Sequence, residues 1–200
     1  MDANLAERLE SIWDNLARAV HDRHSPFRTL MLCTRAEDAP TARIVVLRGV
    51  DRRPGSLWCH SDRRAAKVAQ LSAHPACTVL LWDPRQSLQL RLSCRATQAT
   101  AGPTVEARWA ATPTGARRLY AQTEAPGDPC PPPSLARVQA LSAPPGPAQD
   151  FDHSAARQNF CVIDLHVNGF DALWLHRSGH VRVRYQQRPD STWHAQALVP

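Results

Sequence analysis

Lysine is almost absent from this chain. Of its 24 basic residues, 23 are arginine and only Lys67 is lysine. Long apolar runs are also missing, because no stretch approaches the ~18 to 20 residues that a membrane-spanning helix needs. The first residues, Met1-Asp2-Ala3-Asn4, lack the basic and apolar regions of a secretory signal. These absences predict a cytoplasmic protein without a membrane partner.

Paired cysteines are missing as well. The six cysteines include no Cys-x-x-Cys pair, and five of them lie in apolar, strand-like runs, which predicts reduced and buried thiols. The nine histidines are scattered, and the pair His176 and His180 alone is weak support for zinc. We therefore expect no metal site.

Positive charge is concentrated in one part of the chain. Residues 41–98 contain ten Lys or Arg against three Asp, a net charge of +7, whereas the whole chain carries +6. An excess localised in this way favours an anionic ligand. Two alternatives stay open: the arginines reflect genome composition, or the chain, with a pI near 9.4, binds nucleic acid. The sequence has no helix-turn-helix, zinc-finger or RNP signature, so we expect no nucleic-acid partner.

The hydrophobic pattern predicts a mainly β fold with flanking helices. Residues 4–22 show the spacing of an amphipathic N-terminal helix. Strand-like runs follow at 27–34, 42–50, 56–61, 76–82 and 88–97, with one short helix at 67–73 between the third and the fourth. Five strands interrupted by one short helix favour an antiparallel barrel over βαβ units. We predict one domain that spans residues 1–200.

The second half of the chain predicts helix, loop and then strands again. Residues 103–122 have a helical pattern with a break near Pro113. Residues 125–149 hold eight of the 17 prolines, which predicts a surface excursion with a short helix at 134–141. The remaining strand patterns lie at 159–166, 172–176, 181–186 and 192–198.

One strand-to-helix junction combines the features that hold phosphate. The segment Ser61-Asp62-Arg63-Arg64-Ala65-Ala66-Lys67 ends a predicted strand and opens the helix at 67–73. Free N–H groups at a helix start and cationic side chains together bind phosphate. The strand 42–50 adds Arg43 and Arg48, which point to opposite faces unless a bulge intervenes, because their separation is odd.

The order of these elements resembles the FMN-binding split barrel of the pyridoxamine 5'-phosphate oxidase family. The likeness covers nearly the whole chain and concentrates in four segments, which are Ala42 to Arg48, Ser61 to Leu71, Leu88 to Leu92, and the tail from Leu173 to Pro200. It implies an antiparallel, Greek-key-like split barrel with FMN as cofactor. It also implies a homodimer in which the tail of one subunit completes the cofactor site of the other at the interface.

The resemblance assigns the cofactor contacts segment by segment. The first two segments supply the phosphate ligands Arg43, Ser61, Arg64 and Lys67, the neighbouring His60, and the ring-bordering backbone of Ile44, Val45 and Val46. Gln89 approaches the polar edge of the flavin ring. The second subunit contributes Trp174 and Arg184. Arg48 is a rim or substrate-side residue.

Departures from the family pattern affect the function that the resemblance implies. Ala65 replaces a serine and loses one phosphate contact, whereas Ser61 keeps the hydroxyl of the usual threonine. The oxidase's substrate-gripping Arg-x-His pair is replaced by the segment Gly179 to Arg184. The resemblance thus implies an FMN-dependent oxidoreductase of an unidentified small molecule rather than the true oxidase, with no catalytic side chain that can be named. The alternative is a protein that binds flavin, or a related cofactor such as haem or deazaflavin, without turnover.

Overall fold

The computed structural model describes residues 3–129 and 151–200, which form two compact units. Unit 1 comprises the described residues of 1–59, 70–97 and 163–200, and unit 2 comprises those of 60–69 and 98–162. The single domain that the sequence predicts stays a prediction.

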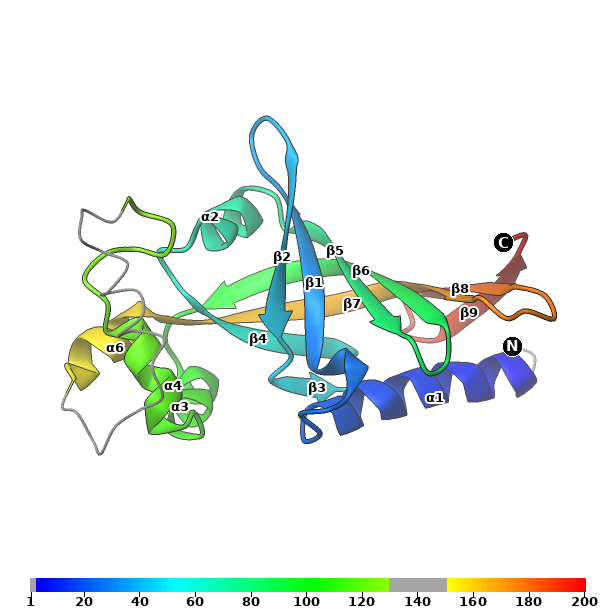
Figure 1. The fold of residues 1–200 in the computed structure, drawn as a ribbon, viewed down its shortest axis with the longest axis horizontal. Helices are drawn as coiled ribbons and strands as arrows, with labels where there is room; N and C mark the ends of the chain where they lie inside the picture. Colours follow the sequence, from blue (N-terminus) through cyan, green and yellow to red (C-terminus); the bar gives the residue numbers. More distant parts are fainter. Residues whose placement is uncertain (1–2, 130–150) are drawn as a thin grey trace. The chain divides into compact units, whose positions relative to one another are not determined.

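The elements are labelled in Figure 1. The first half of the chain contains α1 (Ala3–Ala19), the 3-10 helix η1 (Pro26–Arg28), β1 (Thr29–Arg35), β2 (Pro40–Val46), β3 (Gly49–Asp51), β4 (Ser56–Asp62), α2 (Ala66–Ala73), β5 (Ala76–Asp83) and β6 (Leu88–Ala99). The second half contains α3 (Pro103–Ala110), α4 (Thr114–Arg117), the 3-10 helix η2 (Arg118–Tyr120), α6 (His153–Asn159), β7 (Phe160–Trp174), β8 (Val181–Gln187) and β9 (Trp193–Leu198).

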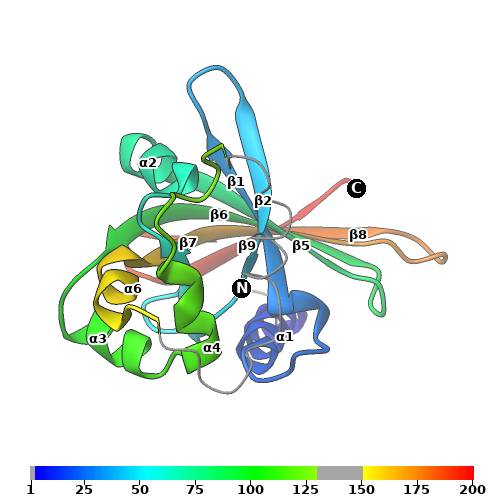
Figure 2. The same cartoon turned by 60° about the vertical axis from the view of Figure 1, so that its left-hand side comes forward.

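The strands form a nine-stranded sheet in the order β2-β1-β5-β6-β7-β4-β3, with β8 paired to β7 and β9 paired to β8. The pairs β1–β2, β1–β5, β3–β4, β5–β6, β7–β8 and β8–β9 are all antiparallel. The turns that follow β5 and β7 lie at the same end of the sheet, where Leu175 N donates to Ser87 O at 2.9 Å (Figure 2). The mainly β, antiparallel fold with an N-terminal helix is confirmed.

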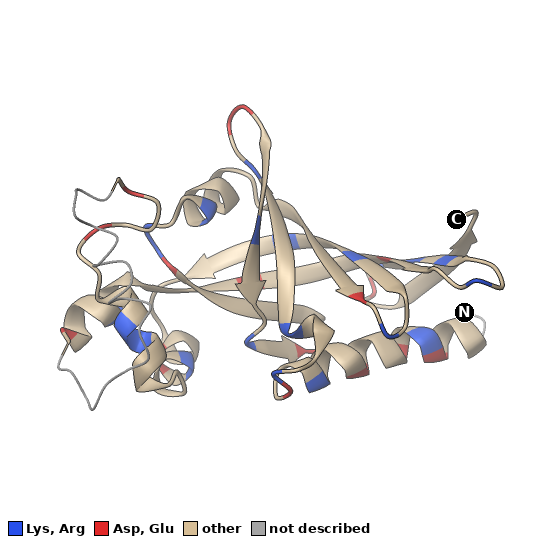
Figure 3. Cartoon of the chain, viewed as in Figure 1, with Lys and Arg blue, Asp and Glu red and all other residues tan. Residues whose placement is uncertain are grey.

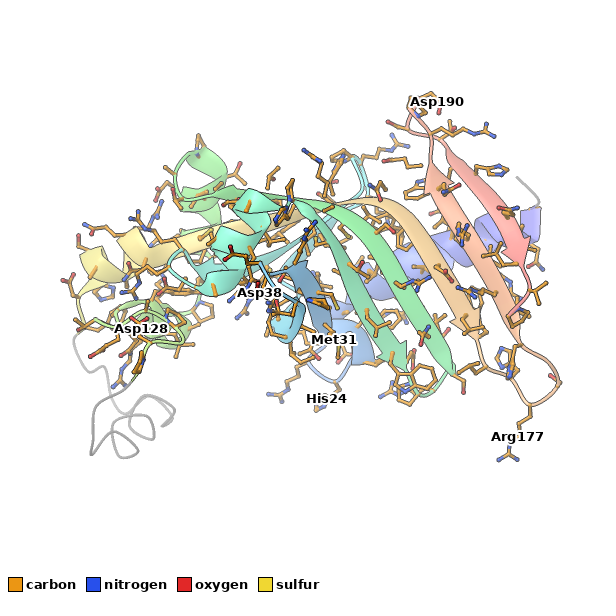
Figure 4. All side chains as sticks on the ribbon, turned by 90° about the horizontal axis from the view of Figure 1, so that it is seen from above. His24, Met31, Asp38, Asp128, Arg177 and Asp190 are labelled. Atoms are coloured by element: carbon orange, nitrogen blue, oxygen red, sulfur yellow. The ribbon has the colours of Figure 1, made fainter. Side chains whose placement is uncertain are left out.

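Helix α1 covers one face of the sheet in unit 1. Its apolar stripe, which includes Ile12 and Leu16, is fully buried. The Trp13 ring meets Phe170 of β7 edge-on with centroids 5.1 Å apart, and the Tyr185 hydroxyl donates to Leu5 O at 3.0 Å. Figure 4 shows β5 to β8 in front with α1 behind them. Side chains on the opposite face of the sheet are therefore not covered by α1.

The predicted strand 42–50 is interrupted in the structure, which corrects the prediction. β2 ends at Val46 and β3 begins at Gly49, because the backbone changes its partner strand between them. Leu47 N still bonds to Arg28 O, next to β1, whereas Arg48 N bonds to Trp58 O of β4. The burial alternation nevertheless continues through Leu47, which is 0% exposed. Arg43 and Arg48 thus lie on opposite faces, as the odd separation predicts.

Two predicted strands, 159–166 and 172–176, are instead one. β7 runs without interruption from Phe160 to Trp174, and its residues from Gly169 onward pair with β8. Smaller differences concern two boundaries: α1 ends at Ala19 rather than at residue 22, and β1 starts at Thr29 after the turn of η1.

Unit 2 is organised around Phe160. The rings of His60, Trp109 and Tyr120 lie 4.8, 5.0 and 5.2 Å from the Phe160 ring, centroid to centroid. Arg117 donates to Ala110 O and Thr112 O, so it satisfies free carbonyls at the end of α3. The predicted helix with a break near Pro113 is confirmed as α3 and α4.

Five cysteines lie in the described part of the chain, and all are free thiols, four of them buried and Cys33 half-buried. This confirms the prediction for those five. Most of the proline-rich stretch, including the predicted helix at 134–141, lies outside the described residues. Within residues 3–129 and 151–200, no helix combines the length and the hydrophobicity needed to cross a membrane.

Candidate functional site

Arg43 of β2 is held by a network of neutral acceptors in unit 1. Its Nη1 donates to Thr34 Oγ1 at 2.6 Å and to Leu32 O at 3.0 Å. Its Nη2 donates to Thr41 Oγ1 at 2.7 Å and to Gln70 Oε1 at 3.0 Å. Thr34 and Thr41 are direct cross-strand partners on β1 and β2, so their hydroxyls converge on one guanidinium.

Arg43 has no counter-ion in the described residues. The guanidinium is half-buried, and its four acceptors are two hydroxyls, one carbonyl and one amide oxygen. Burial lowers the pKa of Arg43 from its ordinary value. Because a partly desolvated cation is stabilised by a nearby anion, this arrangement suits an anionic ligand.

Arg64 of the loop before α2 has a different environment, in unit 2. It forms a bidentate pair with Asp62, with Nε to Oδ1 at 3.0 Å and Nη2 to Oδ2 at 2.7 Å. It also donates to Gln122 O and Thr123 O, both at 2.9 Å. The hydrogen bond to Asp62 raises the pKa of Arg64. The guanidinium therefore ties the loop to the segment after η2.

The same loop holds Ser61 and leads into α2. Ser61 is 3% exposed and donates from Oγ to Asp62 O at 3.0 Å. Ala65 N bonds to Asp62 O and Val68 N bonds to Ala65 O, so the backbone turns directly into the helix. Lys67 is the second residue of α2 and is half-buried. Gln70, the amide that holds Arg43, stands nearly one turn further along this helix.

The remaining predicted cofactor residues of unit 1 lie on two faces of the sheet. Gln89 and Arg184 lie on the face away from α1. Trp174 lies on the opposite face, 6% exposed, with the Arg8 guanidinium carbon of α1 4.9 Å from its ring centroid. Within one subunit the structure thus does not bring Trp174 and Arg184 together.

The ring-bordering segment alternates as a regular strand. Ile44 is 60% exposed, Val45 is 8% exposed and Val46 is half-buried. Arg48, the predicted substrate-side residue, is half-buried on the Ile44 side of this alternation. His60, in unit 2, packs edge-on against Phe160.

An ion-pair cluster that the sequence did not predict lies in unit 1. Asp171 of β7 accepts from Arg91 Nη2 at 2.6 Å, and from Arg182 Nε and Nη2 at 3.0 and 2.9 Å. The hydrogen bond from Arg182, and then that from Arg91, holds the pKa of Asp171 below its ordinary value. Figure 3 shows basic residues along β6 and β8. Asp171 lay between two predicted strands, so its facing residues were not visible in the sequence.

The fold is a mainly β, antiparallel scaffold, and in unit 1 the partly buried Arg43 suits an anionic ligand. Residues 10–100 match the family model described as "Pyridoxamine 5'-phosphate oxidase, FMN-binding domain". This range contains β1 to β6, α2 and the predicted phosphate ligands. The match confirms the resemblance and supports FMN as the cofactor.

Solved structures share the fold. A pyridoxamine 5'-phosphate oxidase-related, FMN-binding protein from Nostoc punctiforme PCC 73102 superposes with a TM-score of 0.74 at 23% identity, covering 95% of this chain and 96% of that one. PhzG from Burkholderia lata 383, solved with tetrahydrophenazine-1-carboxylic acid, superposes with a TM-score of 0.71 at 18% identity, covering 98% and 92%. No curated protein matches this chain in sequence. The structural likeness identifies the fold as that of the FMN-binding split barrels.

Proposed function

We propose that this protein is an FMN-dependent oxidoreductase that acts on a small molecule. The observation that carries the proposal is the match of residues 10–100 to the FMN-binding domain. The two solved proteins described above, one FMN-binding and one bound to a phenazine carboxylic acid, support this class of function by their shared fold.

The residues present fit a bound FMN. Arg43 offers a cation without a carboxylate partner in the described chain, which suits the phosphate dianion. We propose Arg43, Ser61 and Lys67 as phosphate ligands, with Arg64 holding the loop through Asp62. When bound, FMN supplies the electron transfer, and the protein supplies position and electrostatics. We further propose that Gln89 meets the polar edge of the ring.

We also propose a homodimer whose cofactor sites lie at the interface. The sheet face away from α1 exposes large apolar side chains on adjacent strands: Met31 is 37% exposed, Ile44 60% and Trp82 46%. A contiguous exposed apolar face marks a protein interface. We propose that Arg184 of the tail completes the site of the second subunit, whereas Trp174, 6% exposed and packed against α1, lies on the opposite face. Separately, we propose a cytoplasmic location, because the free thiols of the described cysteines fit a reducing compartment.

The proposal is tested by titrating the purified protein with FMN, followed by flavin absorbance and fluorescence. Arg43→Ala and Lys67→Ala should each weaken binding by roughly 1.5 to 3 kcal/mol, as expected for a charge-assisted contact. Gln70→Ala is the matched control, because it removes an anchor of Arg43 but keeps the cation. It should retain FMN affinity within about threefold, since no charge is lost.

Two outcomes would contradict the proposal. If Arg43→Ala and Lys67→Ala both bind FMN as tightly as the wild-type protein, the assignment of these residues as phosphate ligands is wrong. If the protein binds flavin but does not steadily consume a reduced nicotinamide or another electron donor, it is a passive flavin-binding protein and not an enzyme.

A further inference from the structure

A groove lies on the sheet face away from α1, beside Asn168-Gly169 of β7. Val167 and Phe170 are both buried, although residues three apart in a regular strand point to opposite faces. The alternation of buried and exposed residues along β7 is therefore broken at Gly169-Phe170. Gly169 contributes no side chain, and a Cβ atom there would lie 3.3 Å from Tyr185 O and 3.7 Å from Ser93 Cβ. Gly169 therefore allows Tyr185 and Ser93 to approach the β7 backbone closely, and these residues line a hollow on this face.

The hollow is large enough for a small molecule. It has a volume of about 400 Å³ and lies wholly within unit 1. Its wall includes Thr78 and Ser93, which are direct cross-strand partners on β5 and β6, together with Arg91, Asp171 and Arg184. Pockets for small ligands begin at about 300 Å³ and contain a few placed polar groups.

The charges around this groove do not balance. Asp171 is the cross-strand partner of Arg184, but its carboxylate is bonded to Arg91 and Arg182. Arg184 is exposed and has no hydrogen-bond or ion-pair partner in the described chain. Three guanidinium groups thus face one carboxylate. The ion pairs also fix two of the three side chains, which lowers the entropic cost of binding a ligand there.

We propose that this groove binds the anionic group of a small molecule, a carboxylate or a phosphate. Arg91 and Arg184 are the charged ligands, the hydroxyls of Thr78 and Ser93 are neutral donors, and Asp171 is a positioning residue that orients Arg91. The groove lies wholly within unit 1. Because Arg184 is also the residue that we place at the cofactor of the second subunit, the proposal rests on the proposed function and deepens it: the anionic group is that of the small molecule that would bind beside this cofactor.

Calorimetric titration with benzoate and with phenyl phosphate tests the groove, with neutral benzamide as the uncharged probe. The wild-type protein should bind at least one of the two anions and not benzamide, and the tighter anion identifies the group. Arg91→Gln should weaken that binding roughly tenfold or more, as expected for loss of a charge-assisted contact. Arg177→Gln is the control, because Arg177 lies in the turn after β7 and points away from the sheet (Figure 4). It should leave the affinity unchanged.

Equal binding of benzamide, or equal losses in Arg91→Gln and Arg177→Gln, would overturn the proposal. If Arg91→Gln does not fold, Ser93→Ala removes one neutral donor instead and should still weaken binding several-fold. FMN titration of Arg91→Gln, expected within about twofold of wild type, separates the two proposals. If the wild-type protein binds the anions but no FMN, the proposed function fails and the groove assignment stands.

Discussion

Arg43 and Arg64 show how the same side chain serves different purposes in different surroundings. Both lie in the basic window of the sequence, and both are predicted phosphate ligands. The structure surrounds Arg64 with Asp62 and two carbonyls, whereas Arg43 contacts neutral acceptors alone among the described residues. Charge density along the chain could not separate these two cases, because it does not show which acceptors each guanidinium contacts: Asp62 is two residues from Arg64, whereas Gln70 is 27 residues from Arg43.

Asp171 gives a prediction of pH dependence at this scale. Its pKa is lowered by the hydrogen bonds from Arg182 and Arg91, so the folded state binds that proton less tightly than the unfolded chain. The stabilisation is therefore present above the unfolded value of about 3.9 and is lost as the pH falls through the lower folded value. Asp171→Asn should destabilise the protein at neutral pH, and its difference in unfolding free energy from wild type should shrink below about pH 4.

Urea unfolding at pH 7, 5 and 3 measures this difference. Asp38→Asn, an exposed position beyond β1, provides the background effect of removing a carboxylate. A difference between wild type and Asp171→Asn that stays constant down to pH 3 would show that the ion pairs add no stability.

At the scale of elements, the short gap between β2 and β3 depends on one glycine. A Cβ atom at Gly49 would lie 1.7 Å from Cζ2 of Trp58, its direct partner on β4. The indole thus occupies the space that any side chain would need. Gly49→Ala should destabilise the protein by about 1 to 3 kcal/mol or more, because inserted atoms force the ring to move.

Chemical denaturation followed by tryptophan fluorescence checks this value. Gly115→Ala is the control, since Gly115 is exposed within α4 and alanine is favoured there by about 0.5 to 1 kcal/mol. A Gly49→Ala protein as stable as wild type would mean that the Trp58 ring moves without cost.

β7 shows where local sequence signals fail. The pair Asn168-Gly169 is typical of a turn, so the sequence predicts two strands around it. In the structure, β7 continues through this point and pairs with β8 from Gly169 onward, and only the alternation of buried and exposed residues is broken there. The predicted break is thus a local irregularity within one long strand.

At the scale of the whole molecule, the proposed dimer makes a sharp prediction. If Arg184 acts on the cofactor of the second subunit and Lys67 on that of its own, neither variant alone forms a complete site. Unfolding and refolding an equal mixture of Lys67→Ala and Arg184→Ala subunits should yield mixed dimers with one intact site each. Such a mixture should recover tight FMN binding in about a quarter of all sites, since half of randomly formed dimers are mixed.

Flavin titration after refolding measures the recovered fraction, and sedimentation velocity reports the oligomeric state. Met31→Lys should shift the protein toward monomer, because it places a charge on the exposed apolar face. No recovery in the mixture, with each variant dimeric, would place Arg184 outside the cofactor site of the second subunit.

The sequence alone determined the number and kind of most elements, the antiparallel architecture and the family likeness. These follow from hydrophobic periodicity and turn residues, which act over a few neighbouring positions. The tertiary structure decided that Arg64 pairs with Asp62 in a loop bonded to the segment after η2, that Trp174 packs against α1, and that Asp171 gathers two arginines. Apart from the Arg64–Asp62 pair, whose members are two residues apart, these contacts join residues whose meeting depends on packing and strand register, and register is fixed only when the whole sheet forms.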